Sequence, residues 1–314
     1  MMYSRAAAFA AAAMLLPVLA SAQSSVPQAD ASKLARRMSD VCTDCTATKF
    51  TSCGRFLEGP TFDRTGNLWM VSIFSGDVHK VSPEGQCTTM ANTGGEPQGL
   101  KLGRDGKLIG SDRKIGLFSV DPETAKVERI TNNYFVQNFA GLNDLVVDSV
   151  GGTYVTDSYG SGILHPVGRV YYLPPGEKRV VKVLDGLAFP NGIALSPDGK
   201  VLYVTEFSAK RVIASSVVQP GLISPELTYV VAHLADGAGP DGMTVDANGT
   251  MYVAEYNAKS VFVINAENTV LGRITLPEEA GPGTTNVALH DGYLYITEAR
   301  KNEVWRVKIN TKEP

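Results

Sequence analysis

The feature that most constrains the fold of this chain is a six-fold internal repeat. Each copy begins with a polar residue, continues through a short alternating apolar run, turns at a glycine and ends with a second alternating run. Successive copies are spaced by 40, 45, 48, 50 and 45 residues. Self-similarity at a period of about 40–50 residues, in units of short strands, is typical of β-propeller blades. The copies begin at Glu58, Gln98, Asn143, Asn191, Asp241 and Asn286.

The turn inside each copy supports the same fold. A tight hairpin at this place requires positive φ, which glycine adopts without strain. β-Branched and aromatic residues flank the turn with a period of two, as in residues 201–206. Two packed β-sandwiches would not require six copies of one turn, so the sequence predicts an all-β, six-bladed β-propeller. The six turn glycines are Gly66, Gly106, Gly151, Gly199, Gly249 and Gly292.

The N-terminus has the pattern of an export signal. Arg5 precedes an apolar run from Ala6 to Leu19, and small residues follow at 20–22. The run is shorter than the roughly 20 residues that span a bilayer, which favours a cleaved signal peptide over 1–22 rather than an anchor. No later segment is apolar enough to span, so we expect a secreted or periplasmic protein without a membrane span after cleavage.

Two further regions follow the predicted signal peptide. Residues 23–55 form a cysteine-containing N-terminal segment, with a short helix expected over 28–38, and residues 56–314 form the propeller. Residues 49–56 are expected to pair with a late strand near 303–307, because closing the ring removes exposed strand edges.

Four cysteines all lie in the first third of the chain. In an oxidising compartment they are expected to form disulfides that tie the N-terminal segment to the first repeat. Three pairings are possible, and the spacing does not choose among them. A thiol-redox role for the Cys-x-x-Cys pair is less favoured, because no βαβ pattern surrounds it. The cysteines are Cys42, Cys45, Cys53 and Cys87.

The residues that start the six repeats predict a metal-binding central channel. Equivalent positions would lie at one height beside the axis, and all six residues carry a carboxylate or a carboxamide. Burying them together is costly without a partner. Ca²⁺ accepts six to eight oxygen ligands, and Glu58 and Asp241 would balance its charge. The absence of His and Cys from the set favours Ca²⁺ over Zn²⁺, with Mg²⁺ and Mn²⁺ as further alternatives. A hydrogen-bonded polar plug without an ion is the other interpretation.

Three of these motifs resemble a known family. The segments at 57–60, 189–192 and 239–243 are similar to those of the SMP-30, gluconolactonase and luciferin-regenerating-enzyme family of six-bladed propellers, which includes regucalcin, and more distantly to paraoxonases. The resemblance covers roughly residues 56–308. It implies that Glu58, Asn191 and Asp241 bind a metal ion, and that Asn143 binds substrate or metal.

Two departures limit what the resemblance implies about substrate. The sugar lactonases carry an arginine two residues before the asparagine that corresponds to Asn143, and here that residue is Gly141. Paraoxonases carry a histidine where this chain has Gln98. The metal site is therefore a firmer expectation than an aldonolactone substrate.

The sequence thus favours a metal-dependent lactonase or esterase with a small-molecule lactone or ester as substrate. Asp241 is the expected base, and Asn143 and Gln98 are expected to orient the substrate. The net charge of −3 argues against nucleic acid as a partner. No Gly-x-Ser-x-Gly or His-Glu-x-x-His motif is present. A non-catalytic ligand- or protein-binding propeller with a structural metal, and a phosphotriesterase-like hydrolase, are the alternatives.

Overall fold

A computed structural model describes residue 35 and residues 37–310 of the chain. The predicted signal peptide and nearly all of the helix expected over 28–38 lie outside the described residues. Within the described part, one short helix, α1 (Met38–Val41), precedes the strands and contacts the outer strand of one sheet. No helix in that part is long and apolar enough to cross a membrane.

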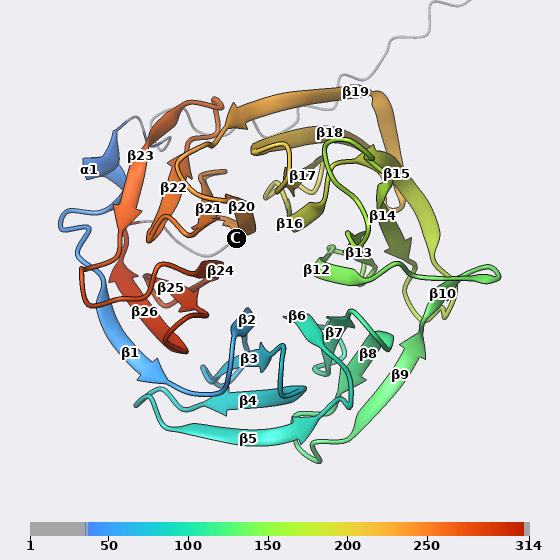
Figure 1. Cartoon of the computed structure of the whole chain (residues 1–314), viewed down its shortest axis with the longest axis horizontal. Helices are drawn as coiled ribbons and strands as arrows, with labels where there is room; N and C mark the ends of the chain where they lie inside the picture. The colour runs from blue at the N-terminus through green and yellow to red at the C-terminus, as the bar shows by residue number, and fades with distance from the viewer. Residues whose placement is uncertain (1–34, 36, 311–314) are drawn as a thin grey trace, which may run out of the picture.

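Six four-stranded antiparallel sheets surround a central axis, which confirms the six-bladed propeller (Figure 1). The innermost strands are β2 (Leu57–Phe62), β6 (Pro97–Leu102), β12 (Leu142–Val147), β16 (Pro190–Leu195), β20 (Gly239–Val245) and β24 (Thr284–His290). The second strands are β3 (Leu68–Ser72), β7 (Leu108–Asp112), β13 (Thr153–Asp157), β17 (Val201–Glu206), β21 (Met251–Tyr256) and β25 (Tyr293–Glu298).

The outer half of each blade completes the sheet. The third strands are β4 (Asp77–Val81), β8 (Gly116–Val120), β14 (Gly168–Leu173), β18 (Arg211–Gln219), β22 (Ser260–Ile264) and β26 (Glu303–Lys308). The outermost strands are β5 (Cys87–Asn92), β9 (Val127–Thr131), β15 (Val181–Leu187), β19 (Leu222–His233), β23 (Val270–Thr275) and β1 (Thr48–Ser52). A small hairpin of β10 (Asn133–Tyr134) and β11 (Gln137–Asn138) lies between the second and third blades.

The repeated glycine is the local cause of this regularity. All six predicted turn glycines adopt the left-handed conformation, with φ values of 81, 85, 94, 69, 81 and 74°. Each turn joins the first two strands of a blade, so one local requirement fixes the same hairpin six times.

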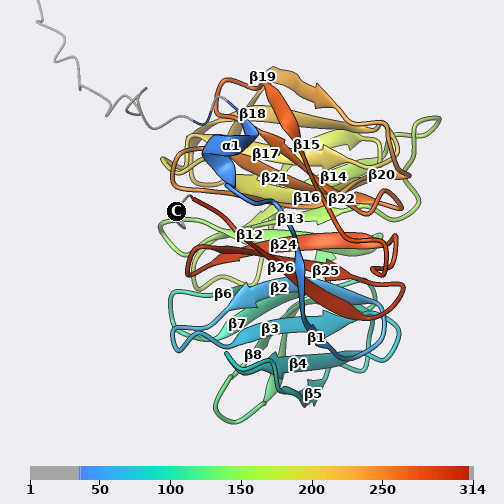
Figure 2. The same ribbon diagram turned by 90° about the vertical axis from the view of Figure 1, so that its left-hand side faces the viewer.

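The ring is closed by strands from the two ends of the described chain. β1 pairs antiparallel with β26, with Thr48 opposite Arg306 and Ser52 opposite Glu303. Figure 2 shows blue β1 running beside red β26. This confirms the expected pairing of the N-terminal segment with the last blade.

Both disulfides involve the N-terminal segment. Cys53, which directly follows β1, is bonded to Cys87 in β5 of the first blade. Cys42 is bonded to Cys45. Of the three pairings that the sequence left open, the structure therefore has one disulfide that holds the closing strand to the first blade, as expected, and one local to the N-terminal segment.

Apolar side chains fill the space between adjacent blades. Trp69 and Val71 of the first blade, for example, pack in one buried cluster with Leu100, Leu108 and Phe118 of the second. These contacts make each blade part of the wall against which the next one packs, which holds the inner strands at fixed positions around the axis.

Candidate active site

The inner strand of every blade is irregular at the place that the sequence singled out. In all six blades the pairing between the first two strands shifts register near the start of the inner strand. Such a bulge re-aims side chains relative to a regular ladder. It lies beside the predicted axial residues, so side chains that would otherwise alternate between faces can point toward the axis.

Register shows which residues are equivalent. The residue before each axial position pairs with a residue at or next to the end of the second strand, as in Pro190–Glu206, Pro240–Glu255 and Thr284–Glu298. The axial residue follows this pair directly. It is one of the predicted residues in five blades: Glu58, Gln98, Asn143, Asn191 and Asp241.

In the sixth blade the axial residue is Thr285, and the expectation for Asn286 was wrong by one position. Asn286 N–H donates to the Thr297 hydroxyl, just as Asp144 N–H donates to the Thr156 hydroxyl. Asn286 is therefore the counterpart of Asp144, one residue deeper along the channel. The Thr285 hydroxyl donates to the Leu57 carbonyl at 2.8 Å rather than facing the predicted ion site.

Asp144 and Asn286 together fill the channel below the axial residues. Asn286 Nδ2 lies 3.2 Å from Asp144 Oδ2 and 3.2 Å from Glu58 Oε2. The other four blades have glycine at this level, and a Cβ at Gly242 would lie 2.0 Å from Asn286 Cγ. Sequence reasoning missed Asp144, although it stands next to Asn143.

The five axial residues that the sequence singled out line one cavity of about 320 Å³. Glu58, Gln98, Asn191 and Asp241 are buried, and Asn143 is half-buried. The structure thus brings together every residue predicted to bind metal or substrate.

Hydroxyl groups from neighbouring blades fix these residues in place. The Thr156 hydroxyl donates to the Asn191 carbonyl at 2.7 Å, and the Thr205 hydroxyl donates to the Asp241 carbonyl at 2.8 Å. The Ser111 hydroxyl donates in the same way to the Asn143 carbonyl. Each bond joins the second strand of one blade to the inner strand of the next, so the backbone under the site is cross-linked around the ring.

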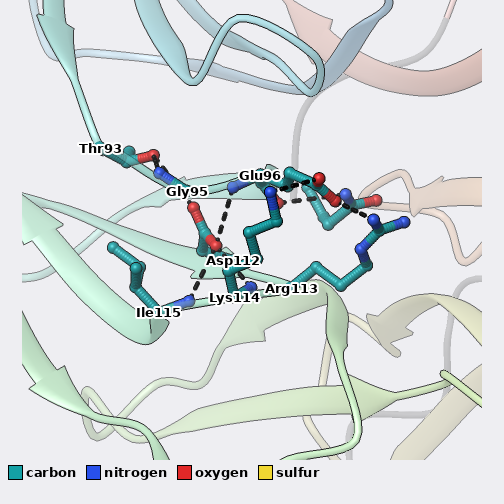
Figure 3. A network of polar contacts seen from close by, with 8 residues as sticks. Thr93, Gly95, Glu96, Asp112, Arg113, Lys114 and Ile115 are labelled. Atoms are coloured by element: carbon teal, nitrogen blue, oxygen red, sulfur yellow. Dashed lines mark hydrogen bonds and ion pairs between the residues drawn. The ribbon is translucent and has the colours of Figure 1, made fainter.

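In five blades, a carboxylate at or next to the end of the second strand orders the loop that leads into the inner strand. Asp112 accepts hydrogen bonds from the backbone of Glu96, Lys114 and Ile115 (Figure 3). The repeated acid is visible in the sequence, but its role as a loop clamp was not predicted. The equivalents that bond loop N–H groups in this way are Asp157, Glu206, Glu255 and Glu298.

Three buried carboxylates in and below the cavity have raised pKa values. Burial, and next the charge of Asp144, raises the pKa of Glu58 to about 8. Burial, followed by the charges of Glu58 and Asp144, raises the pKa of Asp241 well above its usual value. Burial also raises the pKa of Asp144, although Lys101 opposes the rise.

This set of donors fits a hard divalent cation. Two carboxylates and two carboxamides, on Glu58, Asp241, Asn143 and Asn191, offer oxygen atoms to one cavity, and a nearby positive charge would relieve the repulsion between the acids. Sulfur and nitrogen donors occur elsewhere, where Cys53, Cys87 and His79 lie within 4.8 Å of one another. Those two sulfurs are bonded to each other, which leaves no thiolate to bind a metal.

The mouth of the cavity is lined by an arc of aromatic side chains, which we call the aromatic collar: Phe56, Phe74, Tyr159, Phe189, Phe207 and Tyr256. Neighbouring rings in this collar touch in sequence, with centroid separations between 4.9 and 6.4 Å. Ile73 and Arg113 are the other lining residues of the mouth. Sequence analysis assigned none of these residues to the site. All but Tyr256, which ends β21, lie in loops, and their positions are not aromatic in every blade.

Residues 56–300 match the SMP-30/gluconolactonase/LRE-like region family. The chain belongs to this family. The lactonase drp35 of Staphylococcus epidermidis is 32% identical over 237 residues, which cover 73% of this chain and 72% of that protein. The lactonase drp35 of Staphylococcus aureus is 32% identical over 232 residues, covering 71% of each.

Solved structures of family members share the fold. A gluconolactonase from Xanthomonas campestris superposes with a TM-score of 0.74 at 20% identity, covering 87% of this chain and 91% of that one. A calcium-binding protein, regucalcin from Agrobacterium tumefaciens, superposes with a TM-score of 0.71 at 22% identity, covering 84% and 96%. The family assignment supports a lactonase-type enzyme that acts on a small molecule.

Within this family framework, Gly141 has a structural explanation. A Cβ at Gly141 would lie 2.8 Å from Arg113 Cγ and 2.9 Å from Tyr159 Cβ, so these two side chains occupy the room that a larger residue would need. The Arg113 guanidinium stacks 4.2 Å from the Tyr159 ring and forms an ion pair with Glu96 (Figure 3). An arginine is therefore present beside Asn143, but it comes from the preceding blade and its charge is already paired.

Proposed function

We propose that this protein is a metal-dependent hydrolase that opens a lactone or a related ester. The observation that carries the proposal is the convergence of Glu58, Asn143, Asn191 and Asp241 in one cavity, where buried acids repel one another. Membership in a lactonase-containing family supports the same reaction class.

These four side chains would hold the ion, and Ca²⁺ suits their oxygen donors best. A divalent cation bound there supplies Lewis acidity toward a carbonyl oxygen. Because its positive charge would favour ionised carboxylates, Asp241 would be available as a base despite its burial.

Side chains of the protein carry out the remaining steps. Asp241 takes the proton from the attacking water as the water oxygen bonds to the carbonyl carbon, and returns it to the leaving oxygen as the acyl C–O bond breaks. Gln98 and Asn143 orient the substrate by hydrogen bonds, and Gln98 is held for this by a 3.1 Å bond from its Nε2 to the Glu96 carbonyl. The collar limits access of bulk water to the cavity, which strengthens the electrostatic interactions inside it.

Substitution of Asp241 tests this mechanism. Asp241→Asn keeps the size of the side chain and removes the base, so hydrolysis of a lactone panel should fall by at least about 100-fold, the contribution of a positioned base. The matched control Asp198→Asn changes a carboxylate near the Gly199 hairpin turn, outside the cavity, and should leave turnover unchanged. Near-wild-type hydrolysis by Asp241→Asn would refute the assignment.

Metal dependence is tested separately by unfolding. Ca²⁺ at about 100 times its Kd should stabilise the chelator-treated protein by about 2.7 kcal/mol. Glu58→Gln should reduce this gain. Unchanged stability with Ca²⁺, Mg²⁺, Mn²⁺ and Zn²⁺ alike would count against an ion site.

Two alternative functions are separated by the same assays. Binding of lactones with metal but without turnover would favour a non-catalytic propeller with a structural ion, and turnover confined to phosphotriesters would favour a phosphotriesterase-like enzyme.

We also propose that the protein is exported and is therefore secreted or periplasmic. The apolar run at 6–19 with small residues at 20–22 supports this, as do two disulfides in the described chain. Mass spectrometry of the protein isolated from its native cell should find an N-terminus at residue 23; a mature protein that keeps residues 1–22 would refute the cleavage.

A further inference from the structure

We propose that the aromatic collar selects lactones or esters with an apolar alkyl or aryl substituent, and disfavours polyhydroxylated sugar lactones. This inference rests on the proposed hydrolytic function, because it names the substrate class of the same site. The collar supplies the apolar walls, and the axial residues supply the polar floor that faces the reacting carbonyl.

The shape of the collar suits a flat or aliphatic group. Phe56 contacts both Phe74 and Tyr256, at ring separations of 4.9 and 6.3 Å. Phe207 continues the arc at 6.4 Å from Tyr256 and 5.7 Å from Phe189. A substituent that projects from the axial site toward solvent would pass between these faces and bury apolar surface against them.

Hydrogen-bonding capacity is scarce at the same level. Of the described residues that line the mouth, Arg113 is the one charged group, and its guanidinium is paired with Glu96 and stacked on Tyr159. Two tyrosine hydroxyls are the other polar groups of the collar. Several sugar hydroxyls would lose their bonds to water here and find few new partners, which disfavours their binding.

Two residues of the collar also share an unusual backbone conformation. Phe56 and Phe189 have φ values of 57 and 58°, a left-handed conformation that bulky residues rarely adopt. Both stand two residues before an axial residue, where the third, fifth and sixth blades have Gly141, Gly239 and Gly283. The glycines do not share this conformation, since Gly141 and Gly239 have a φ of 159° and Gly283 has no positive φ. Phenylalanine lines the cavity mouth in both of its blades.

The test uses three δ-lactones that share one reactive ring: unsubstituted δ-valerolactone, alkyl-substituted δ-decalactone and glucono-δ-lactone. With Ca²⁺ present and spontaneous hydrolysis subtracted, kcat/KM for δ-decalactone should exceed that for glucono-δ-lactone by about 100-fold, as expected when apolar contacts are made in one case and hydroxyls are left unpaired in the other. A preference for glucono-δ-lactone would overturn the proposal.

Variants locate the preference in the collar. Phe207→Ala should lower the ratio of kcat/KM for δ-decalactone over δ-valerolactone by about 10-fold. Phe74→Ala should lower the ratio in the same direction, and because Phe74 is 67% exposed this substitution should not disturb folding. The control Phe135→Ala removes an aromatic ring that is 81% exposed and outside the cavity, and should leave the ratio unchanged. Ratios unaffected by Phe207→Ala and Phe74→Ala would refute the role of the collar.

The experiments give different results if the hydrolytic function is wrong than if the role of the collar in selectivity is wrong. If no lactone is opened with any divalent metal, the hydrolytic function is wrong, and calorimetric titration of the same lactones still tests the collar. Tighter binding of δ-decalactone, weakened by Phe207→Ala, would then support it, whereas equal or absent binding would overturn it. Hydrolysis of glucono-δ-lactone alone would uphold the reaction and overturn the collar.

Discussion

Glu255 allows a test of how burial affects the protonation of a carboxyl group that orders a loop beneath the site. It is fully buried near the end of β21, where its Oε1 accepts a 2.8 Å hydrogen bond from Gly237 N–H, in the loop that leads to Asp241. Its Oε2 has no hydrogen-bond partner among the described residues. Burial raises the pKa of Glu255 to about 7, outweighing the opposing effects of Gly237 and Lys210.

The sign of the pH effect follows from this shift. The folded state holds the proton more tightly than the unfolded state, whose pKa is near 4.5. The resulting stabilisation is complete below pH 4.5 and is lost as the pH rises through about 7. A pKa rise of this size corresponds to at most about 3 kcal/mol of folding stability, and residual solvent screening reduces this contribution to about 1–3 kcal/mol. Glu255→Gln removes the titration but keeps an oxygen acceptor for Gly237.

Urea unfolding between pH 5 and pH 8, with saturating Ca²⁺ to hold the axial residues in one state, measures this contribution. The stability of Glu255→Gln relative to wild type should increase by about 1–3 kcal/mol across this range. Glu298→Gln is the matched control in the last blade. Because the Glu298 carboxylate accepts bonds from Gly283, Arg300 and Lys301, this variant should be less stable than wild type throughout. A constant difference between Glu255→Gln and wild type would refute the reasoning.

Three further predictions concern the channel and the ring closure. Gly242→Ala should destabilise the protein by about 1–3 kcal/mol in urea unfolding and weaken Ca²⁺ binding, because its Cβ would overlap Asn286; wild-type stability would contradict the packing. Asp144→Asn should lower the pKa of Glu58, since the Asp144 charge is one cause of its rise; carbon-detected NMR titration measures this, and an unchanged pKa would contradict it. Replacing Cys53 and Cys87 by alanine should reduce the free energy of unfolding by about 2–4 kcal/mol, and more than loss of the Cys42–Cys45 disulfide, because the cross-linked loop is longer; equal losses would argue against this account.

The fold was predictable because its signals are local and repeated. A turn glycine such as Gly199 specifies one hairpin through its own φ, and six copies at similar spacing specify a ring. The pairing of β1 with β26 could also be inferred, because an open last blade would leave an exposed edge.

The site was predictable only in part, because the sequence does not specify the pairing register of a β-strand to a single residue. A shift of one residue redirects a side chain, and the run Thr284–Thr285–Asn286 offered no local signal of which residue faces the cavity. The bulge in the third blade, which lies between Leu142 and Leu145, had a further effect. It allows the successive residues Asn143 and Asp144 to approach the axis together, whereas strict alternation would turn one of them away.

The collar was difficult to predict by comparing repeats, because its positions are aromatic in some blades and not in others. Features common to the blades, such as the turn glycines and the loop-clamping carboxylates, build the ring and hold its inner strands. Residues that differ between blades, such as Phe56 against Gly141, line the cavity mouth without bearing on the hairpins. Changes at shared positions should therefore alter mainly stability, as for Gly242 and Glu255, whereas changes in the collar should alter mainly selectivity. A ring built in this way allows the residues at the cavity mouth to differ without altering the inner strands that hold the axial residues.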